Sequence, residues 1–340
     1  MDSLKKILSL YGLVSPGVVK SIERMLLIAI KFHQPDKSEQ EIKNYFQNED
    51  LILVLNNLIL YSQQFFFARQ DERWELFIPA WIVDNKSEIL KLCLQTHLCN
   101  PVLPEAKEYD AVAIFGANKS EIFRRYRFLH HLIKSKKIKI KNCVYLLTGH
   151  RKLTPRIDGS EAYLIYLHQK FGSDLIETHV MVDLYDKFNF AKELGSLVGV
   201  KVIDTPEVNN RRPNTYDTLI ELRKQLMPAD KKILFISRSP AFLEQKAAVD
   251  RAFTGSEVIY EVAGGGCGLF EVKDEARASY HILMSIAGAL YENYLVVGQQ
   301  LIDEQKIYDI SQLESFKKQL GFRNNPVKEV IFSNQRLTAH

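Results

Sequence analysis

The sequence has few cysteines and no long apolar segment. Its four cysteines in 340 residues are too few for a disulfide framework, and the closest pair, Cys93 and Cys99, lacks the spacing of a zinc site. We therefore expect buried thiols in a reducing compartment. The amino-terminal residues show no secretory signal, and the apolar stretches 51–60 and 283–297 are too short or too interrupted to cross a bilayer. A soluble cytoplasmic protein without a transmembrane segment is expected.

The sequence also lacks the common cofactor and catalytic signatures. No GxGxxG pattern follows the first expected strand and there is no Walker lysine motif, so the standard dinucleotide and P-loop fingerprints are absent. No HExxH or comparable spacing predicts a metal site. Ser237 and Ser239 lie outside any nucleophile-elbow pattern, which argues against a serine hydrolase.

The overall charge is nearly balanced, but its distribution along the chain is uneven. The formal net charge is only +4, so the chain as a whole does not have the composition of a polyanion-binding protein. Between Lys119 and Arg156, however, twelve lysines and arginines accompany a single acid, Glu121. This excess could contact phosphates or nucleic acid. No aromatic ladder or RNA motif accompanies it, and a solvated helix face explains it at least as well, so no nucleic-acid partner is predicted.

Residues 1–104 are predicted to form a helical N-terminal region. A helix is expected to begin at Pro16, because proline suits the first helical turn. Ser38 and Glu41 have the spacing of a capping box for the next helix. No catalytic spacing occurs in this region. We expect it either to cover the sheet domain or to contact a protein partner.

After the prolines at 101–104 the pattern changes to short apolar runs that alternate with helical segments. The runs are 111–116, 143–149, 200–204, 232–237 and 256–262. Continuous apolar strands separated by helices indicate a parallel sheet that is covered on both faces. We therefore predict an α/β fold, a Rossmann-like three-layer parallel sheet, for residues 105–297. Residues 298–340 are predicted to be a C-terminal extension.

Polar and glycine residues follow each expected strand. In an open parallel sheet, ligands bind beyond the carboxyl ends of the strands, so these residues are candidates for a binding site. The ligand-binding candidates are Gly116, Asn118, Thr148, Gly149, Arg151, Arg212, Asn214, Thr215, Ser237, Arg238, Gly264, Gly265 and Gly266. The glycines after the last strand would let a diphosphate approach the backbone amides, although a loop without a ligand can have the same composition.

The stretch 200–218 shows this arrangement most clearly. A short apolar run ends in a loop rich in asparagine, arginine and proline, and a helix is expected at 216–227. Asn214 suits the N-cap, where its side-chain oxygen accepts a free backbone amide. The helix start, Arg211 and Arg212 favour an anionic ligand. An ordinary capped loop with two solvated arginines fits the pattern equally well.

The candidate catalytic groups are carboxylates and one histidine near the expected strand ends. Glu177 opens a helix beside the predicted cleft, and His150 directly follows a strand that ends in Thr-Gly, so both could transfer protons. Asp158 is the third candidate. Capping and surface pairing would account for any one of these carboxylates, and the same holds for the other acids near the strand ends, Glu161, Asp204 and Asp217.

Several short motifs occur in a distinctive order between Asp110 and Tyr294. They are, in chain order, AIFGAN, LLTGHR, the helix start ETHVM, NTYDT, ISRSPAFLEQKAAV and ALYENY. In this order they resemble the YdcF/SanA/ElyC-like superfamily, a Rossmann-like group of mostly uncharacterised bacterial proteins. The chain departs from that pattern at Gln245-Lys246-Ala247, where many members have arginine-alanine. Two segments, one beginning at Glu161 and one at Glu177, compete for the acidic helix of the family.

The resemblance implies a small nucleotide-like ligand, with S-adenosylmethionine among the alternatives, and no cofactor is certain. Two functions remain open. The first is an enzyme that hydrolyses or transfers a group on a substrate that resembles ADP-ribose or an adenine nucleotide. The second is a non-catalytic nucleotide or S-adenosylmethionine-binding module whose helical region contacts a partner.

Overall fold

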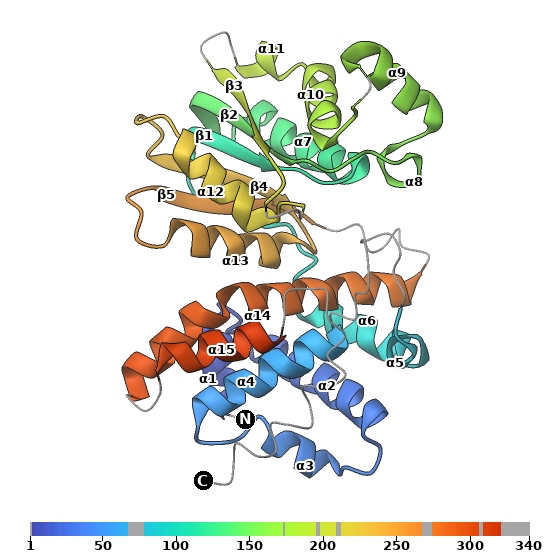
Figure 1. The fold of residues 1–340 in the computed structure, drawn as a ribbon, viewed down its shortest axis with the longest axis vertical. Helices are drawn as coiled ribbons and strands as arrows, with labels where there is room; N and C mark the ends of the chain where they lie inside the picture. The colour runs from blue at the N-terminus through green and yellow to red at the C-terminus, as the bar shows by residue number, and fades with distance from the viewer. Residues whose placement is uncertain are drawn as a thin grey trace. The chain divides into compact units, whose positions relative to one another are not determined.

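A computed structural model describes residues 2–66, 78–172, 174–194, 198–208, 212–266, 274–305 and 309–320. The chain divides into two compact units (Figure 1). One unit contains the described residues up to Cys99 together with those from 274 onwards, and the other runs from Asn100 to the end of the sheet. The first unit is helical and the second is α/β, so the predicted fold class with a helical N-terminal region is confirmed.

The helical unit contains helices from both ends of the chain. They are α1 (Asp2–Leu10), α2 (Pro16–His33), α3 (Glu39–Asn44), α4 (Leu51–Tyr61), the π-helical turn η1 (Ser62–Phe66), α5 (Ala80–Asp84), α6 (Lys86–Gln95), α14 (Glu275–Gln305) and α15 (Ile310–Leu320). Helix α2 begins at Pro16 as predicted. Ser38 and Glu41 form the predicted capping box of α3, which satisfies two backbone amides.

The long helix α14 packs on helices of the N-terminal region. It contacts α4, α6 and η1, and Tyr294 donates a hydrogen bond of 2.6 Å to the side-chain oxygen of Asn56. Tyr11 donates a hydrogen bond to the carbonyl oxygen of Leu290. Residues 275–297, which the sequence pattern places in the α/β domain, therefore group with the helical unit. The reason is long-range packing, because the apolar surface of α14 is buried against helices that are distant in sequence.

The α/β unit is built on five parallel strands. In chain order its elements are β1 (Glu108–Phe115), α7 (Lys119–Lys134), β2 (Lys139–Gly149), α8 (Pro155–Asp158), α9 (Glu161–Phe171), α10 (Glu177–Phe188), α11 (Phe190–Leu194), β3 (Gly199–Thr205), α12 (Thr215–Gln225), β4 (Lys232–Arg238), α13 (Phe242–Phe253) and β5 (Ile259–Gly265). The strand order is β3-β2-β1-β4-β5. The chain winds outward from β1 to β3 and then returns to place β4 beside β1. A crevice for ligands is expected at this reversal, beyond the carboxyl ends of β1 and β4.

Helices cover both faces of the sheet (Figure 1), and alternate residues of the strands enter two separate cores, one on each face. On one face Val112 and Leu146 pack with α7, α10 and α11. On the other face Phe115 and Phe235 pack with α12 and α13. These strands are buried on both faces, which is why they appear in the sequence as continuous apolar runs rather than alternating ones.

The last strand is shifted from its predicted position. It was expected at 256–262, but β5 continues through Gly264 and Gly265, which pair with Ser237 and Arg238 of β4. The backbone of Gly264 also exchanges two hydrogen bonds of 2.9 Å with Val102 on its outer side. Pairing on both sides thus overrides the weak strand propensity of glycine.

The described cysteines Cys93, Cys99 and Cys143 are buried, as expected, and form no disulfide, while Cys267 lies outside the described residues. Burial raises the pKa of the Cys143 thiol to about 11, so this group is protonated at neutral pH and is a poor nucleophile. Within the described ranges, none of the helices has both the length and the apolar character that a membrane crossing requires.

Candidate functional site

A buried cluster of charged side chains lies where β1 and β2 end. Arg151, just after β2, donates from Nε to Glu177 Oε2 at 2.9 Å. Its two terminal nitrogens each donate to one carboxylate oxygen of Asp158 at 2.7 Å. All three side chains are at least 95% buried, so their charges are poorly screened by water. The structure therefore brings together three residues that the sequence indicated separately.

Within this cluster Arg151 and Asp158 are engaged by the protein itself. A fourth hydrogen bond of Arg151 goes to the carbonyl oxygen of Ala117, after β1. Asp158 also accepts from the backbone amide of Thr154. Burial alone would lower the pKa of Arg151, but Asp158 and Glu177 outweigh it and raise that pKa. The arrangement suits a positioning role for both residues, in place of the ligand-binding and catalytic roles suggested by their sequence positions.

Glu177 supplies the remaining carboxyl group of this cluster, which is not held by a bidentate pair as Asp158 is. It is the first residue of α10, and its backbone amide donates to the carbonyl oxygen of Arg151 at 2.9 Å. Burial raises the pKa of Glu177, while the nearby positive charges of Arg151 and Arg212 oppose the shift. The competing acid Glu161 lies exposed at the start of α9. Glu177 is thus the acid of these two that belongs to the cluster.

Gly116 makes room for the Glu177 carboxyl group. A Cβ atom on Gly116 would overlap Glu177 Oε1 and would lie 2.6 Å from the carbonyl oxygen of Leu147. The glycine that follows β1 is therefore required by close packing of protein atoms, whatever ligand binds nearby. Gly149 has a comparable role, because its added Cβ would lie 2.8 Å from Pro213 Cγ in the loop before α12.

The loop before α12 brings one arginine to the cluster. The guanidinium of Arg212 lies 3.8 Å from Glu177 Oε2, and its side chain is 41% exposed. Asn214 caps α12 as predicted, and it forms a capping box with Asp217. Thr215 is the first residue of that helix. Arg211, the second arginine of the loop, lies outside the described residues.

A second buried arginine, Arg125 of α7, was not among the predicted site residues. It donates hydrogen bonds of 2.7 Å to the carbonyl oxygens of Phe115 and Gly116, and it contacts Gln245 at 3.3 Å. Gln245 in turn accepts a hydrogen bond of 2.5 Å from Ser237. Ser237 is thus held by the protein between β4 and α13. The missed signal is an arginine on the apolar face of α7, in helical register with Ile122 and Leu129.

Two further candidates lie near the start of α7. Asn118 caps this helix by accepting from the backbone amide of Glu121. Arg238, at the end of β4, forms an ion pair with the Glu121 carboxylate. Both residues are therefore placed at the reversal between β1 and β4, but they bind protein groups there.

Two glycines of the predicted ligand loop lie within the last strand. Gly264 and Gly265 are strand residues, and the Gly265 carbonyl oxygen accepts from the backbone amide of Ser239. A Cβ on Gly264 would lie 3.1 Å from the backbone of Ser237, so close strand packing explains this glycine. Gly266 follows the strand, and Cys267 and Gly268 lie outside the described residues.

At the carboxyl ends of β2 and β3, Thr148 and His150 form another polar group with Asp204. His150 Nε2 lies 3.1 Å from Asp204 Oδ2, and both side chains are partly exposed. Thr148 is buried and contacts the other oxygen of Asp204 at 3.3 Å. In the described parts of the chain, no three or more histidine, cysteine, aspartate or glutamate side chains come together as a metal site.

Helix α9, beside this edge, packs on the core mostly with partly buried apolar side chains and also makes polar contacts with α10. Leu167 is its only fully buried residue among those described. Asp183 of α10 accepts hydrogen bonds from four side chains, which are Tyr163, Tyr166, Lys170 and Lys187. Burial would raise the pKa of Asp183, but these hydrogen bonds outweigh burial and lower it. One carboxylate thus holds α9 against α10.

Asp183→Asn is expected to destabilise the protein by about 1–3 kcal/mol near neutral pH, because a buried charged acceptor of several hydrogen bonds is lost. The folded-state pKa of Asp183 is lowered, so its contribution is complete above the unfolded value of 3.8 and disappears as pH falls through the folded value. Urea unfolding of wild type and variant from pH 7 to pH 3 should show the difference shrinking only at the acidic end. Asp186→Asn, at a 57% exposed side chain that also pairs with Lys170, is the control. An equal loss at every pH would contradict this account.

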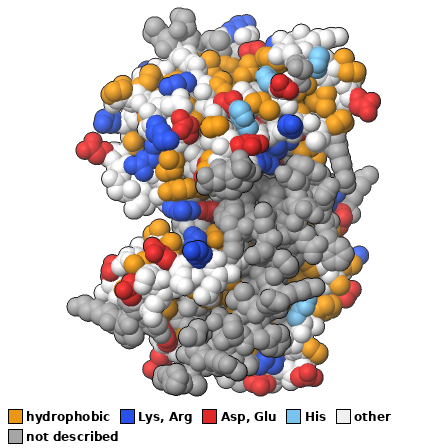
Figure 2. Space-filling model, viewed as in Figure 1, with side chains coloured by type: hydrophobic (Ala, Val, Ile, Leu, Met, Phe, Trp, Pro, Cys, Tyr) orange, Lys and Arg blue, Asp and Glu red, His pale blue; other side chains and the backbone are white. Residues whose placement is uncertain are grey.

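Some of the basic residues in the stretch 119–156 are buried or paired. Arg125 and Arg151 are buried in the contacts described above, and Lys141 forms an ion pair of 3.1 Å with Glu108. On the face shown in Figure 2, lysines and arginines are interspersed with acidic side chains. These observations favour the solvated-face explanation of the local basic excess.

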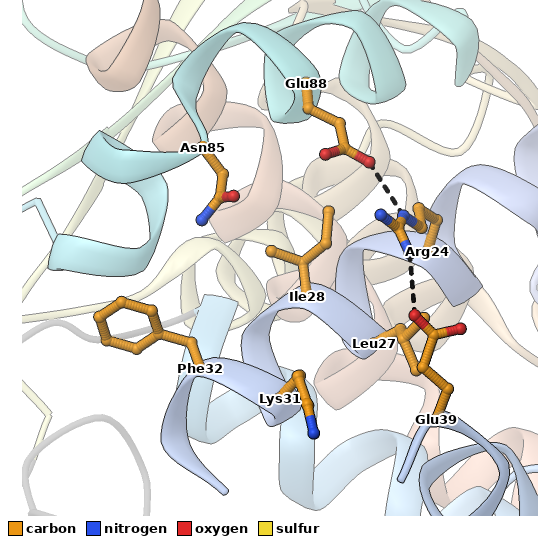
Figure 3. Close-up of a pocket in the computed structure, with 8 residues that line it drawn as sticks. All are labelled: Arg24, Leu27, Ile28, Lys31, Phe32, Glu39, Asn85 and Glu88. Carbon is orange, nitrogen blue, oxygen red and sulfur yellow. Dashed lines mark hydrogen bonds and ion pairs between the residues drawn. The ribbon is translucent and has the colours of Figure 1, made fainter. Parts of the chain in front are cut away.

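The helical unit has a shallow hollow of its own, with a volume of about 270 Å³ (Figure 3). It lies between α2, α3 and α6, and Phe32 and Ile28 line its apolar part. Arg24 crosses it and binds Glu88 at 2.9 Å and Glu39 at 3.6 Å. Because its arginine is already neutralised by two acids, this hollow is a poor match for an anionic ligand. The predicted partner contact of the helical region stays a prediction.

No family model, no curated protein and no solved structure matches this chain.

Proposed function

We propose that the α/β unit binds a nucleotide-type molecule at the carboxyl edge of its sheet and hydrolyses or transfers a group on it. The observation that carries this proposal is Glu177. Its carboxyl group is buried, is fixed by Arg151 and lies against Gly116 at the end of β1. A buried titratable group with a shifted pKa at this edge is typical of functional sites.

The topology supports a nucleotide-type ligand. Parallel sheets that reverse their strand order, as this one does between β1 and β4, commonly bind nucleotides at that point. Helices α7 and α12 begin at the same edge, and Arg212 adds a partly exposed cation that suits phosphate. The order of the AIFGAN, LLTGHR, ETHVM and NTYDT motifs adds the likeness to the YdcF/SanA/ElyC-like superfamily.

The chemistry that we propose for Glu177 is proton donation. Because burial raises its pKa, the carboxyl group holds its proton at higher pH than an exposed glutamate does. A protonated carboxyl group beside a bound nucleotide can give its proton to a departing oxygen. ADP-ribose and adenine nucleotides are the substrates that we favour. The buried thiols, which form no disulfide, are compatible with action in the cytoplasm.

One observation favours the second candidate, a non-catalytic module that binds a nucleotide or S-adenosylmethionine. Both carboxylate oxygens of Asp158 are bound by Arg151, so Asp158 has a structural reason to be present. Only one of the two predicted catalytic carboxyl groups then remains for chemistry. In this alternative the helical unit would report the bound state to a partner.

Isothermal titration of the full chain with ADP-ribose, ATP and S-adenosylmethionine tests the proposal, together with product analysis by chromatography. Arg212→Ala should weaken binding of a phosphorylated ligand by about tenfold to a hundredfold, because it removes a charge-assisted contact. Glu177→Gln keeps the shape of the side chain and should abolish turnover while affinity stays close to that of wild type. Lys224→Ala, at an exposed lysine late in α12, is the matched control and should change nothing.

The outcomes separate the two candidates. Binding without turnover, with affinity lowered by Glu177→Gln, would favour the non-catalytic module. If none of the three ligands binds wild type, the nucleotide proposal fails. If one binds and Arg212→Ala matches Lys224→Ala, the ligand does not contact the loop before α12.

A further inference from the structure

A chain of hydrogen bonds lies on the β3 side of β2, and the proposed role of Glu177 does not use it. Thr178 donates from Oγ1 to Asp204 Oδ1 at 3.0 Å, and Thr148 lies 2.8 Å from Thr178 Oγ1. The second carboxylate oxygen of Asp204 lies 3.1 Å from His150 Nε2. Because each hydroxyl has one proton, the simplest arrangement runs from Thr148 through Thr178 to Asp204.

This chain fixes the orientation of the imidazole. Asp204 has one oxygen held by the Thr178 hydroxyl and one directed at His150, so its carboxylate selects the tautomer with the proton on Nε2. The lone pair of Nδ1 is then available as a proton acceptor. The backbone amide of His150 donates to the carbonyl oxygen of Thr205, which fixes the residue at the end of β2. Its side chain is 43% exposed, so water can reach the ring.

The two polar groups are joined by the first turn of α10. Glu177 and Thr178 are consecutive residues there, and they contact Arg151 and Asp204 respectively. One helix start therefore sets both a buried carboxyl group and an oriented imidazole at the same edge of the sheet. Two titratable groups in contrasting surroundings are the usual basis for dividing acid and base roles.

We propose that His150 is the catalytic base of this site, that Asp204 positions it, and that the substrate is a phosphoric ester or anhydride of a nucleotide. This rests on the proposed function. Nδ1 of His150 takes a proton from water as the water oxygen bonds to phosphorus. The bond from phosphorus to the leaving oxygen breaks, and that oxygen takes the proton of the Glu177 carboxyl group. The imidazolium then releases its proton to solvent, and Glu177 takes one up, which restores both groups.

The test measures steady-state hydrolysis of ATP and of ADP-ribose by the full chain, with and without added imidazole. His150→Ala should lower kcat by about 10²–10⁴-fold and change KM by no more than about threefold, because general-base catalysis acts on the reaction step. Added imidazole should restore part of the lost rate, since the ring is accessible. Asp204→Asn should lower kcat without rescue by imidazole. His131→Ala, at an exposed histidine of α7, is the control and should match wild type.

Imidazole rescue is the readout that a structural role for His150 would not give. His150→Ala with unchanged kcat, or with a loss that imidazole does not restore, would overturn the assignment. Wild type that binds a probe and hydrolyses neither would also overturn it, while the binding part of the proposed function would stand. Wild type that binds neither ATP nor ADP-ribose would remove the proposed function and this inference together.

Discussion

Replacing Arg151 by methionine should destabilise the α/β unit by about 3–5 kcal/mol, the usual cost of breaking a buried ion pair by removing one partner. Asp158 has no exposed surface, so its carboxylate cannot regain water where it lies, and Glu177, which is only 4% exposed, loses a hydrogen-bond donor. Methionine fills much of the space of the arginine stem, and the loss would therefore report mainly the missing charge and hydrogen bonds. Urea unfolding at pH 7 measures the effect.

Two comparisons identify the cause of that loss. Arg124→Met removes an exposed arginine that pairs with Glu121, and it should cost no more than about 1 kcal/mol. Adding Asp158→Leu to Arg151→Met replaces the orphaned carboxylate with an apolar side chain and should recover part of the stability. If Arg151→Met is no more harmful than Arg124→Met, the buried cluster does not hold this edge of the sheet together. If the second substitution recovers no stability, the unpaired Asp158 carboxylate is not the cause of the loss.

The elements that are determined locally could be predicted from the sequence. The strands of the sheet are apolar throughout because both of their faces are buried, and this composition is visible without a structure. Asn214 and Ser38 cap helices within three residues of themselves, so their roles also follow from short spacings. Glu177 is indicated for a similar reason, since it opens a helix beside the predicted cleft.

The roles that depend on distant partners could not be predicted. Arg151 and Asp158 follow the same strand, and their spacing in the sequence does not show that they bind each other. The glycine composition around Gly264 suggests a ligand loop. Its pairing with Val102 cannot be foreseen, because the two residues are far apart in the sequence. The sequence pattern places most of helix α14 in the α/β domain. The helix instead packs on helices from the other end of the chain, which the local pattern cannot show.

The sequence thus indicates which residues meet at the carboxyl edge of the sheet, but not what each of them contacts there. Parallel strands end at one edge, so residues that follow strands were expected to meet there. Their hydrogen-bond partners decide which of them are available to a ligand, and those partners come from other strands and helices. Arg125 is the opposite case, a site residue that the sequence does not indicate. An arginine on a helix face can be recognised as buried only when that face is known to cover the sheet.

Gly116→Ala should be the most damaging small substitution at this edge, with an expected loss of roughly 1–3 kcal/mol from overpacking. The added Cβ would overlap Glu177 Oε1 and approach the Leu147 carbonyl oxygen to 2.6 Å. The carboxyl group can move, but the carbonyl belongs to β2 and can shift only with the strand. We therefore expect a displaced Glu177, a lower free energy of unfolding and weaker binding of whichever nucleotide binds wild type.

Gly265→Ala is the matched control, because its Cβ would lie 3.6 Å from Phe128, an ordinary contact distance. It should change stability by no more than about 0.5 kcal/mol. A double-mutant cycle with Glu177→Ala then separates the two obstacles at Gly116. If Gly116→Ala costs much less in the absence of the Glu177 carboxyl group, the glycine is there to admit that group. If the cost is the same in both backgrounds, the obstacle is the Leu147 carbonyl. Gly116→Ala that matches Gly265→Ala in stability and binding would show that Gly116 does not constrain Glu177, and the close fit between β1 and α10 would lose its functional meaning.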